Sequence, residues 1–232
     1  MRLNKVEILC TRPLDNSLVY KAAGKGIGIQ TATFIDTLPI ATTAVVELIQ
    51  SLNAQKITAV FTSMNAVDAV SMHLSQKPAW DIFCMGGATK TLVQKTFGLN
   101  AIHASAKSGA ALAEKIVQTN TIKNVIFFCG DQRLDELPQT LRTHNIQVQE
   151  VVVYTTIQTP QLIEESFNGV VFFSPSAVHS FFSMNTVATD VILFAIGKTT
   201  AATITTYCSN KVVTSDWPGK EQMIDLVIEY FS

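Results

Sequence analysis

The sequence predicts an α/β fold with two similar parallel-sheet lobes joined by a two-stranded β-ladder, the second lobe being inserted in the first. One observation behind this prediction is that short runs of Val, Ile and Phe alternate with stretches of helical period, as in parallel sheets covered on both faces. Another is a repeated device, "FTSMNAVDAVS" at 61–71 and "FFSPSAVHSFF" at 172–182. In each copy a strand end, a serine and a short turn lead into an amphipathic helix.

The buried strands are expected where apolar β-branched and aromatic residues cluster in short runs. Helices are expected where apolar residues recur three or four positions apart and so share one core-facing stripe. The expected strands are 6–10, 58–62, 82–86, 124–129, 169–174, 191–197 and 211–214. The expected stripes are Val67, Val70 and Leu74 after Ser63; Leu134, Leu137 and Leu141 after Arg133; and Met223, Val227 and Phe231 within 219–231.

Two further stretches, 29-36 and 147-158, are rich in β-branched residues but carry polar residues on alternate positions. This pattern suits exposed extended strands better than buried parallel ones. Since they bracket the middle of the chain, we expect them to be the connecting strands between the lobes. The expected first lobe is then discontinuous, 1-34 and 157-232, and the expected inserted lobe is 37-149.

The repeated device extends into a longer internal repeat. Ser63 and Ser174 occupy equivalent positions in the two copies. At the same separation along the chain, Gly86 and Thr89 of "MGGATKTLVQ" are matched by Gly197 and Thr200 of "AIGKTTAATI". A looser match relates "SAKSGAALAEKI" at 105–116 to "SDWPGKEQMIDLVI" at 215–228. The repeat favours two copies of one α/β unit over a single large sheet.

Composition excludes several classes of function. The 232 residues carry 17 basic and 18 acidic side chains, a net charge of −1, without a Lys/Arg run that would follow a phosphate backbone, so no nucleic acid partner is expected. The apolar runs are far shorter than the roughly 20 residues of a membrane span, and no membrane association is expected. The N-terminal apolar stretch is too short for a signal peptide, which predicts a cytoplasmic protein.

Cysteine and histidine spacing gives no metal site. The four cysteines form no C-x-x-C pair and are expected to be reduced and mostly buried, and the four histidines lack H-x-x-x-H spacing. A Walker loop is not expected, because Ile192 stands where "AIGKTTA" would need its first glycine. No G-x-S-x-G nucleophile elbow occurs.

The candidate binding residues follow the carboxyl ends of the expected parallel strands. Loops there line the ligand crevice of an open sheet, and helix N-termini present unpaired N–H groups that suit carboxylates or phosphates. Ser63, Ser174 and Ser176 have the alternative interpretation of plain helix N-caps. The candidate residues are Thr11, Arg12, Thr62, Ser63, Asn65, Ala66, Gly86, Thr89, Ser105, Gly130, Arg133, Ser174, Ser176, Ala177, Thr199 and Thr200.

The motifs "CTRP", "FTSMNAV", "FFCGDQRLDELPQTL", "VVVYTT", "VVFFSPSAV" and "FAIGKTTAATI" together resemble the uroporphyrinogen-III synthase family over essentially the whole chain. The resemblance implies a monomeric enzyme that acts on hydroxymethylbilane, a linear tetrapyrrole polycarboxylate. It implies loss of water, inversion of the last ring through a spiro intermediate and closure of the macrocycle, with no cofactor or metal. It also implies a catalytic role for Tyr154, which matches the family's tyrosine and would assist departure of the hydroxyl group.

The sequence departs from the family pattern in its first connector, which lacks a proline, and in "SMNAV", which stands for the usual "SPxAV" turn. Two other functions stay open from the residues. One is a non-catalytic two-lobed module that binds a tetrapyrrole or another polyanion for regulation; the absence of an added domain after Ser232 favours the enzyme over it. The other is a phosphate- or nucleotide-dependent two-lobed enzyme.

Overall fold

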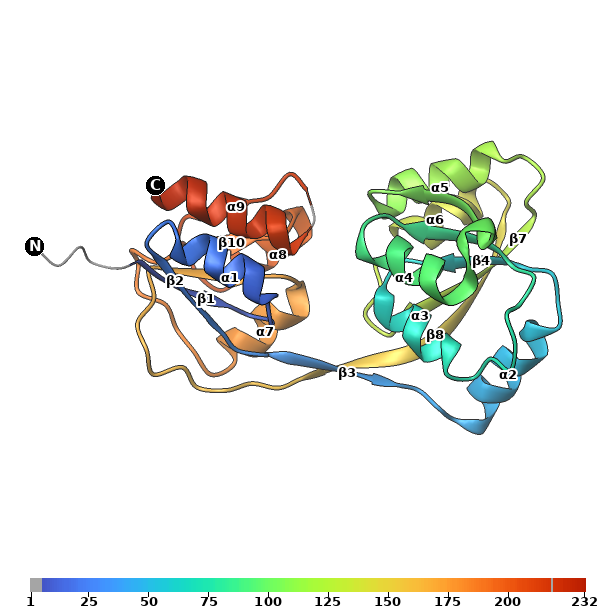
Figure 1. Ribbon diagram of the computed structural model, residues 1–232, viewed down its shortest axis with the longest axis horizontal. Coiled ribbons are helices and arrows are strands. Elements are labelled where there is room, and N and C mark those ends of the chain that lie inside the picture. The colour runs from blue at the N-terminus through green and yellow to red at the C-terminus, as the bar shows by residue number, and fades with distance from the viewer. Residues whose placement is uncertain (1–5, 218) are drawn as a thin grey trace, which may run out of the picture. The chain divides into compact units, whose positions relative to one another are not determined.

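The computed structural model describes residues 6–217 and 219–232 and has the predicted α/β architecture with parallel sheets (Figure 1). The chain divides into two compact units. Unit 1 comprises Met1–Asp36 and Ile157–Ser232, and unit 2 comprises Thr37–Thr156. Residues 1–5 of the expected first lobe, and Pro218 in the loop at 215–219, lie outside the described residues.

Unit 1 is a five-stranded parallel sheet with the order β11-β10-β9-β1-β2. Helices α7 and α8 pack on one face, around Phe172 and Leu193, and helices α1 and α9 pack on the other, around Ile8 and Phe194. Both faces are therefore covered, as the continuous apolar strands require. The elements are β1 (Val6–Cys10), α1 (Asn16–Ala23), β2 (Ile27–Thr31), β9 (Gly169–Phe172), α7 (Pro175–Phe182), β10 (Ile192–Ala195), α8 (Lys198–Ile204), β11 (Val212–Thr214) and α9 (Lys220–Phe231).

Unit 2 is built around a six-stranded sheet with the order β3-β8-β7-β4-β5-β6, in which β8 to β6 are parallel. Helices α2, α3 and α4 pack on the face that carries Phe61 and Phe128, and α5 and α6 pack on the face that carries Phe83 and Phe127. The elements are β3 (Ile35–Pro39), α2 (Thr43–Asn53), β4 (Thr58–Phe61), α3 (Met64–Ser71), β5 (Asp81–Met85), α4 (Ala88–Phe97), the 3-10 helix η1 (Leu99–Ala101), β6 (Ile102–Ala106), α5 (Gly109–Gln118), β7 (Asn124–Gly130), α6 (Glu136–Thr143) and β8 (Gln147–Gln158).

The two sheets have the same strand order with a circular permutation of the chain. Strands β6-β5-β4-β7-β8 of unit 2 correspond to β11-β10-β9-β1-β2 of unit 1. Strands β7 and β8, with helix α6 between them, come last in the sequence of unit 2. Their counterpart in unit 1, β1–α1–β2, comes first in the sequence. The sequence repeat covers only the three β/α pairs that keep the same order in both units, because the fourth has moved along the chain.

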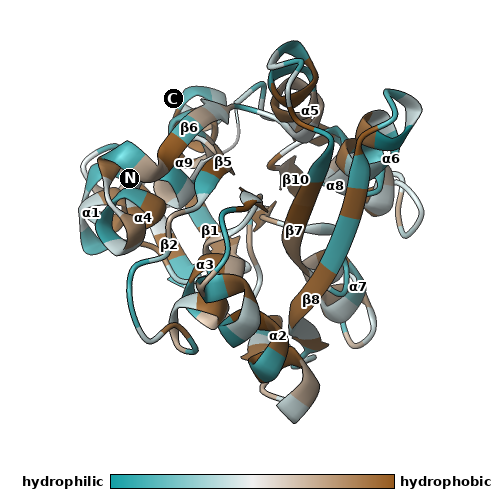
Figure 2. Ribbon diagram, turned by 90° about the vertical axis from the view of Figure 1, so that its right-hand side faces the viewer, coloured by the Kyte–Doolittle hydropathy of each residue, from teal (hydrophilic) through white to brown (hydrophobic). Residues whose placement is uncertain are grey.

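The second connecting strand has the predicted bounds, since β8 spans Gln147–Gln158. It is also a full member of the unit 2 sheet, parallel to β7, which corrects the expectation of an exposed strand only. From Gln147 to Val153 more exposed and more buried residues alternate, because successive side chains of a strand point to opposite faces of the sheet. Figure 2 shows this as brown and teal bands along β8, next to a nearly uniform brown β7.

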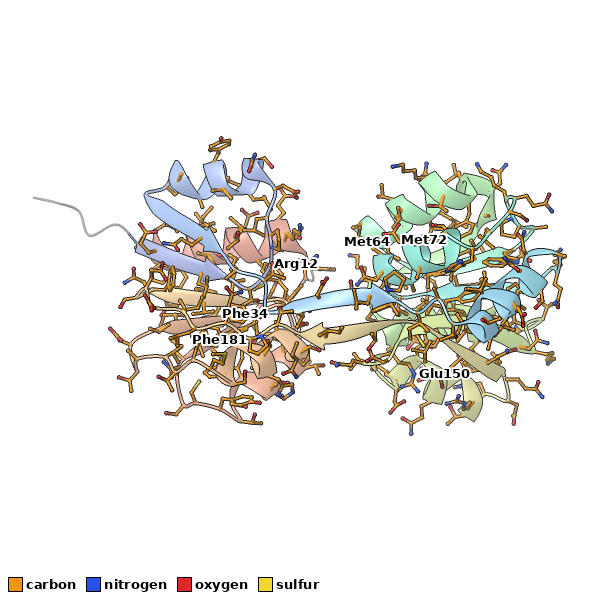
Figure 3. The ribbon with its side chains drawn as sticks, turned by 90° about the horizontal axis from the view of Figure 1, so that it is seen from below. Arg12, Phe34, Met64, Met72, Glu150 and Phe181 are labelled. Carbon is orange, nitrogen blue, oxygen red and sulfur yellow. The ribbon has the colours of Figure 1, made fainter. Side chains whose placement is uncertain are left out.

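The first connecting strand, expected at 29-36, is wrong as a single element. Strand β2 ends at Thr31 and β3 begins at Ile35. Between them Phe34 is fully buried, with its ring edge-on to Phe181 at 5.2 Å between centroids (Figure 3). Burying this ring in the core of unit 1 interrupts the extended strand.

The apolar stripes are confirmed for Val67, Val70, Met223 and Val227, which are fully buried, whereas Phe231 and Leu74, the latter beyond the end of α3, are half-buried. The stripe after Arg133 is wrong in one position: Leu134 is 62% exposed, because α6 begins only at Glu136. No helix among the described residues is long and apolar enough to cross a membrane.

Candidate active site

The carboxyl ends of the parallel strands in unit 2 bring most of the predicted site residues to one edge of the sheet. Strand order places the end of β7 between β8 and β4, so that Gly130 lies between Tyr154 and the Thr62–Ser63 turn. The residues that the structure places along this edge are Thr62, Ser63, Asn65, Ala66, Gly86, Thr89, Ser105, Gly130, Arg133 and Tyr154.

Tyr154 lies across the face of Gly130. The two residues are partners in the β7–β8 ladder, and a Cβ built on Gly130 would meet Cε2 of the ring at 2.6 Å and the phenol oxygen at 2.8 Å. Neighbouring strands are about 4.8 Å apart, so a side chain on β8 reaches β4 only by crossing β7. The missing side chain of Gly130 gives the ring this path.

Ser63, beyond Gly130, lies near enough to the Tyr154 side chain for hydrogen bonding with it to lower the pKa of the phenol. Burial raises the pKa of the Tyr154 phenol above its ordinary value, while hydrogen bonding with Ser63 offsets part of that rise and the charges of Cys129 and Asp131 add to it. Tyr154 is therefore a protonated, half-buried phenol at neutral pH. Such a group can donate a proton to a bound oxygen.

Ser63, Ser108 and Ser174 are all helix N-caps. Their hydroxyl oxygens accept hydrogen bonds at 3.2 Å from the backbone N–H groups of Ala66, Ala111 and Ala177, respectively. The alternative interpretation as an N-cap is thus correct for Ser63 and Ser174 but wrong for Ser176, which lies within α7. A cap uses only the acceptor side of the hydroxyl, so the O–H of each serine remains a donor. Substrate contact by Ser63 and Ser174 therefore stays a prediction.

Several predicted binding groups already have partners within the fold. The N–H of Gly86 donates to the Ala106 carbonyl at 2.7 Å. The guanidinium of Arg133 donates from Nε to Glu150 and from Nη1 to Asp135, the latter at 2.6 Å. Glu150, labelled in Figure 3, also accepts from Arg142 at 2.6 Å. In this arrangement Arg133 ties the loop after β7 to β8.

The other predicted residues lie at the corresponding edge of unit 1. Thr11 is buried, and its hydroxyl donates to the Val171 carbonyl at 2.9 Å. Arg12 is exposed, with its guanidinium 5.6 Å from the centroid of the Phe173 ring (Figure 3). Ser174 and Thr199 are accessible, whereas Ser176, Ala177 and Thr200 are buried.

Asp131, directly after Gly130, is absent from the residues singled out in the sequence. Its two carboxylate oxygens accept hydrogen bonds from Thr155 Oγ1 at 2.7 Å and from the Thr156 N–H at 2.9 Å. The signal available in the sequence was a carboxylate at a strand end, "CGD", but its partners lie far along the chain on β8. Only the parallel pairing of β7 and β8 brings them together.

Among the described residues no group of three or more His, Cys, Asp and Glu side chains is arranged to hold a metal ion. Burial raises the pKa of the Cys10 thiol to about 12 and those of Cys84 and Cys129 to about 11. These three thiols are neutral at physiological pH. They lack the thiolate character that nucleophilic or metal-binding cysteines need.

A family model for uroporphyrinogen-III synthase HemD matches residues 21–225. Among solved structures, uroporphyrinogen-III synthetase from Helicobacter pylori shares 16% identity, with 97% of this chain and 99% of that chain covered and a TM-score of 0.68. A mutant uroporphyrinogen III synthase from Thermus thermophilus shares 12% identity, with 97% of each chain covered and a TM-score of 0.65. At these identities the structural likeness shows the fold, and the family match extends over most of the sequence.

Proposed function

Because the chain belongs to the uroporphyrinogen-III synthase HemD family, we propose that it converts hydroxymethylbilane to uroporphyrinogen III. The reaction removes water, inverts the last pyrrole ring and closes the macrocycle. Membership of this family makes the protein a cyclising lyase of haem biosynthesis with a small tetrapyrrole substrate.

The single observation that supports a chemical role within the chain is the protonated phenol of Tyr154 on Gly130. Departure of hydroxide from a carbon next to an electron-rich pyrrole leaves an azafulvene cation. A donor near the leaving oxygen makes the departing group water, and general acid assistance is typically worth about 10² to 10⁴ in rate. We assign this donor to Tyr154. Ser63, which lowers the pKa of the phenol, stabilises the tyrosinate left after proton transfer.

Hydroxymethylbilane also carries carboxylates, and the strand-end edges offer groups that bind them. The first turns of α3, α5 and α7 present backbone N–H groups, and the capping serine of each helix occupies one of them. The serine O–H groups and the exposed guanidinium of Arg12 add donors. Amides and hydroxyls in this number suit a polycarboxylate without a strongly basic surface, in agreement with the net charge of −1.

The proposal also includes the state of the protein and what it needs for turnover. We expect turnover by a cytoplasmic monomer, without cofactor, metal or nucleic acid. We further propose that units 1 and 2 are the two domains of the enzyme, with β3 and β8 as the strands that connect them. Holding the last ring for attack at its substituted carbon is then the main demand on the protein, because the bilane also cyclises without inversion.

The test is to give purified protein freshly made hydroxymethylbilane and to separate the uroporphyrinogen isomers after oxidation. The III isomer is expected in excess over the I isomer that forms spontaneously. Accumulation of the I isomer alone would overturn the proposal. If the bilane is bound but not inverted, the protein is a tetrapyrrole-binding module, and stabilisation by nucleotides instead would indicate a phosphate-dependent enzyme.

A further inference from the structure

The ladder between β7 and β8 changes register beside Tyr154. Cys129 pairs with Val152, but Gly130 pairs with Tyr154, so that one extra residue of β8, Val153, lies between the two pairs. Such a bulge breaks the alternation of side chains along a strand and redirects the next one. Val153 is fully buried, and Tyr154 follows it onto Gly130.

Strand β8 continues to Gln158, but β7 ends at Gly130. The backbone groups of β8 beyond Tyr154 therefore have no partner strand on the side of β7. Asp131 supplies hydrogen-bond partners there instead. Its N–H donates to the Tyr154 carbonyl at 3.2 Å, and its carboxylate accepts from the Thr156 N–H and the Thr155 hydroxyl. One residue thus holds three consecutive residues of β8, beginning with the tyrosine.

We propose that Asp131 is a positioning residue for Tyr154: its carboxylate fixes the backbone of 154–156 so that the phenol stays over Gly130 beside Ser63. This inference rests on the proposed function, which gives Tyr154 its chemical role. It adds a residue that contacts no reacting atom in that mechanism. Both carboxylate oxygens are bonded to β8, which leaves Asp131 to act through the tyrosine.

A fixed donor matters here because of the geometry that general acid catalysis requires. The phenol must lie within hydrogen-bond reach of the leaving oxygen, and an error of about 1 Å in a reacting group can cost on the order of 10² in rate. A carboxylate is well suited to the fixing task, since it accepts two bonds and the bonds to an ionised acceptor are strong.

The experiment separates geometry from charge with two substitutions at one position. Asp131→Ala removes both bonds. Asp131→Asn keeps an oxygen that accepts from the Thr156 N–H and an amide that donates to the Thr155 hydroxyl, but it removes the charge. Asp81→Ala is the matched control, because Asp81 begins β5 at the opposite edge of the same sheet. Each variant is first compared with the wild type for thermal unfolding, and then assayed for the III isomer.

We expect Asp131→Ala to lower kcat by about 10- to 10²-fold with little change in KM. Asp131→Asn and Asp81→Ala are expected to stay within about threefold of the wild type, and rescue by asparagine identifies positioning rather than charge. A wild-type kcat for Asp131→Ala would overturn the proposal. Equal losses in Asp131→Ala and Asp131→Asn would also overturn it, because they would assign the effect to the carboxylate charge.

A second measurement does not depend on activity. Protein labelled with 3-fluorotyrosine gives a fluorine NMR signal for each tyrosine, and Tyr154→Phe identifies the one from residue 154. The groups that affect the pKa of this phenol are Ser63, which caps α3, Cys129 from β7 and Asp131 itself. We expect the signal to move toward the position of an exposed tyrosine in Asp131→Ala, and to move much less in Asp131→Asn, which removes the charge near the phenol but keeps both contacts to β8.

An unmoved signal in Asp131→Ala would contradict the inference whatever the enzyme assay shows. If the wild-type protein makes no III isomer while the signal moves as expected, the proposed function fails and the positioning of Tyr154 by Asp131 stands. The two ideas are therefore tested separately.

Discussion

Gly130 and Tyr154 are ladder partners, and the phenol ring occupies the space above Gly130 where any other residue would carry its side chain. This pair joins the fold to the proposed chemistry. The glycine is needed for the space it leaves, since its φ is not in the left-handed region.

Gly130→Ala should displace the Tyr154 ring, because the new methyl group would lie 2.8 Å from the phenol oxygen. We expect kcat to fall by about tenfold or more, and the free energy of unfolding to fall by about 1–3 kcal/mol from overpacking. Gly109→Ala is the matched control, as its Cβ would meet its nearest neighbour at an ordinary 3.6 Å. A fully active Gly130→Ala enzyme would show that the ring does not need this position.

Tyr154→Phe removes one half-buried hydroxyl and leaves the ring in place. Turnover should fall by about 10²-fold or more if the phenol is the general acid. Unfolding by urea should be almost unchanged, since the hydrogen bonding of one half-buried hydroxyl contributes only about 1 kcal/mol. Steady-state rates of III-isomer formation measure the effect, and wild-type rates would remove Tyr154 from the mechanism.

Serine-to-alanine changes at positions 63, 108 and 174 form an internally controlled series. All three serines cap a helix with the same 3.2 Å contact, so each change should lower the free energy of unfolding by a similar amount, about 1 kcal/mol. Ser63→Ala should in addition lower kcat, because of the three serines it is Ser63 that lowers the pKa of the Tyr154 phenol. If all three variants lost activity equally, capping alone would account for Ser63.

Glu150 should make stability depend on pH in the acid range. Burial would raise the pKa of its carboxyl, but the hydrogen bonds from Arg133 and Arg142 outweigh burial and lower the pKa. A carboxyl with a lowered folded pKa stabilises the protein at neutral pH and loses this effect as the pH falls below about 4, its ordinary value. Glu150→Gln should therefore cost about 1–2 kcal/mol at pH 7 and much less at pH 3. Urea unfolding at both pH values measures the difference; an equal cost at each would refute the charge-based explanation.

The four cysteines should differ in reactivity toward Ellman's reagent at pH 8. Cys10, Cys84 and Cys129 are buried and their thiol pKa values are raised by burial to about 12, 11 and 11, so they should react only after unfolding. Cys208 is half-buried and should give a single faster phase in the native protein. Cys208→Ser should abolish that phase, and a second fast thiol in the native state would contradict the burial of the other three.

Sequence periodicity predicted most of the sheet because its strands are short apolar runs, each buried on both faces. Strand β6, Ile102–Ala106, was missed because "IHASA" has a single large apolar residue. The break at 32–34 was missed because the burial of Phe34 depends on Phe181, which lies far along the chain. Local patterns carry no information on such pairs.

The sequence predicted that the candidate residues lie at the carboxyl ends of the strands, but it did not predict the contacts between them. Parallel strands bring their carboxyl ends together, and this rule predicted Ser63 and Gly130 as candidates, whereas Tyr154 was predicted from the family resemblance. The rule did not reveal that Gly130 serves the tyrosine ring, or that Arg133 is paired with Glu150 and Asp135. Those facts depend on the register of β7 against β8, which includes a bulge that no sequence pattern announces.

The permuted order of the two sheets affects how the protein folds. All strand pairs between β4 and β8 form within one continuous stretch, with loops of modest length. In unit 1, by contrast, Ile8 of β1 must pair with Gly169 of β9, across the whole of unit 2. Closing so long a loop costs entropy before the contact is formed, and non-local pairing slows folding. Unit 2 should thus fold first, and its completion brings β1 and β2 within reach of the strands that finish the second sheet.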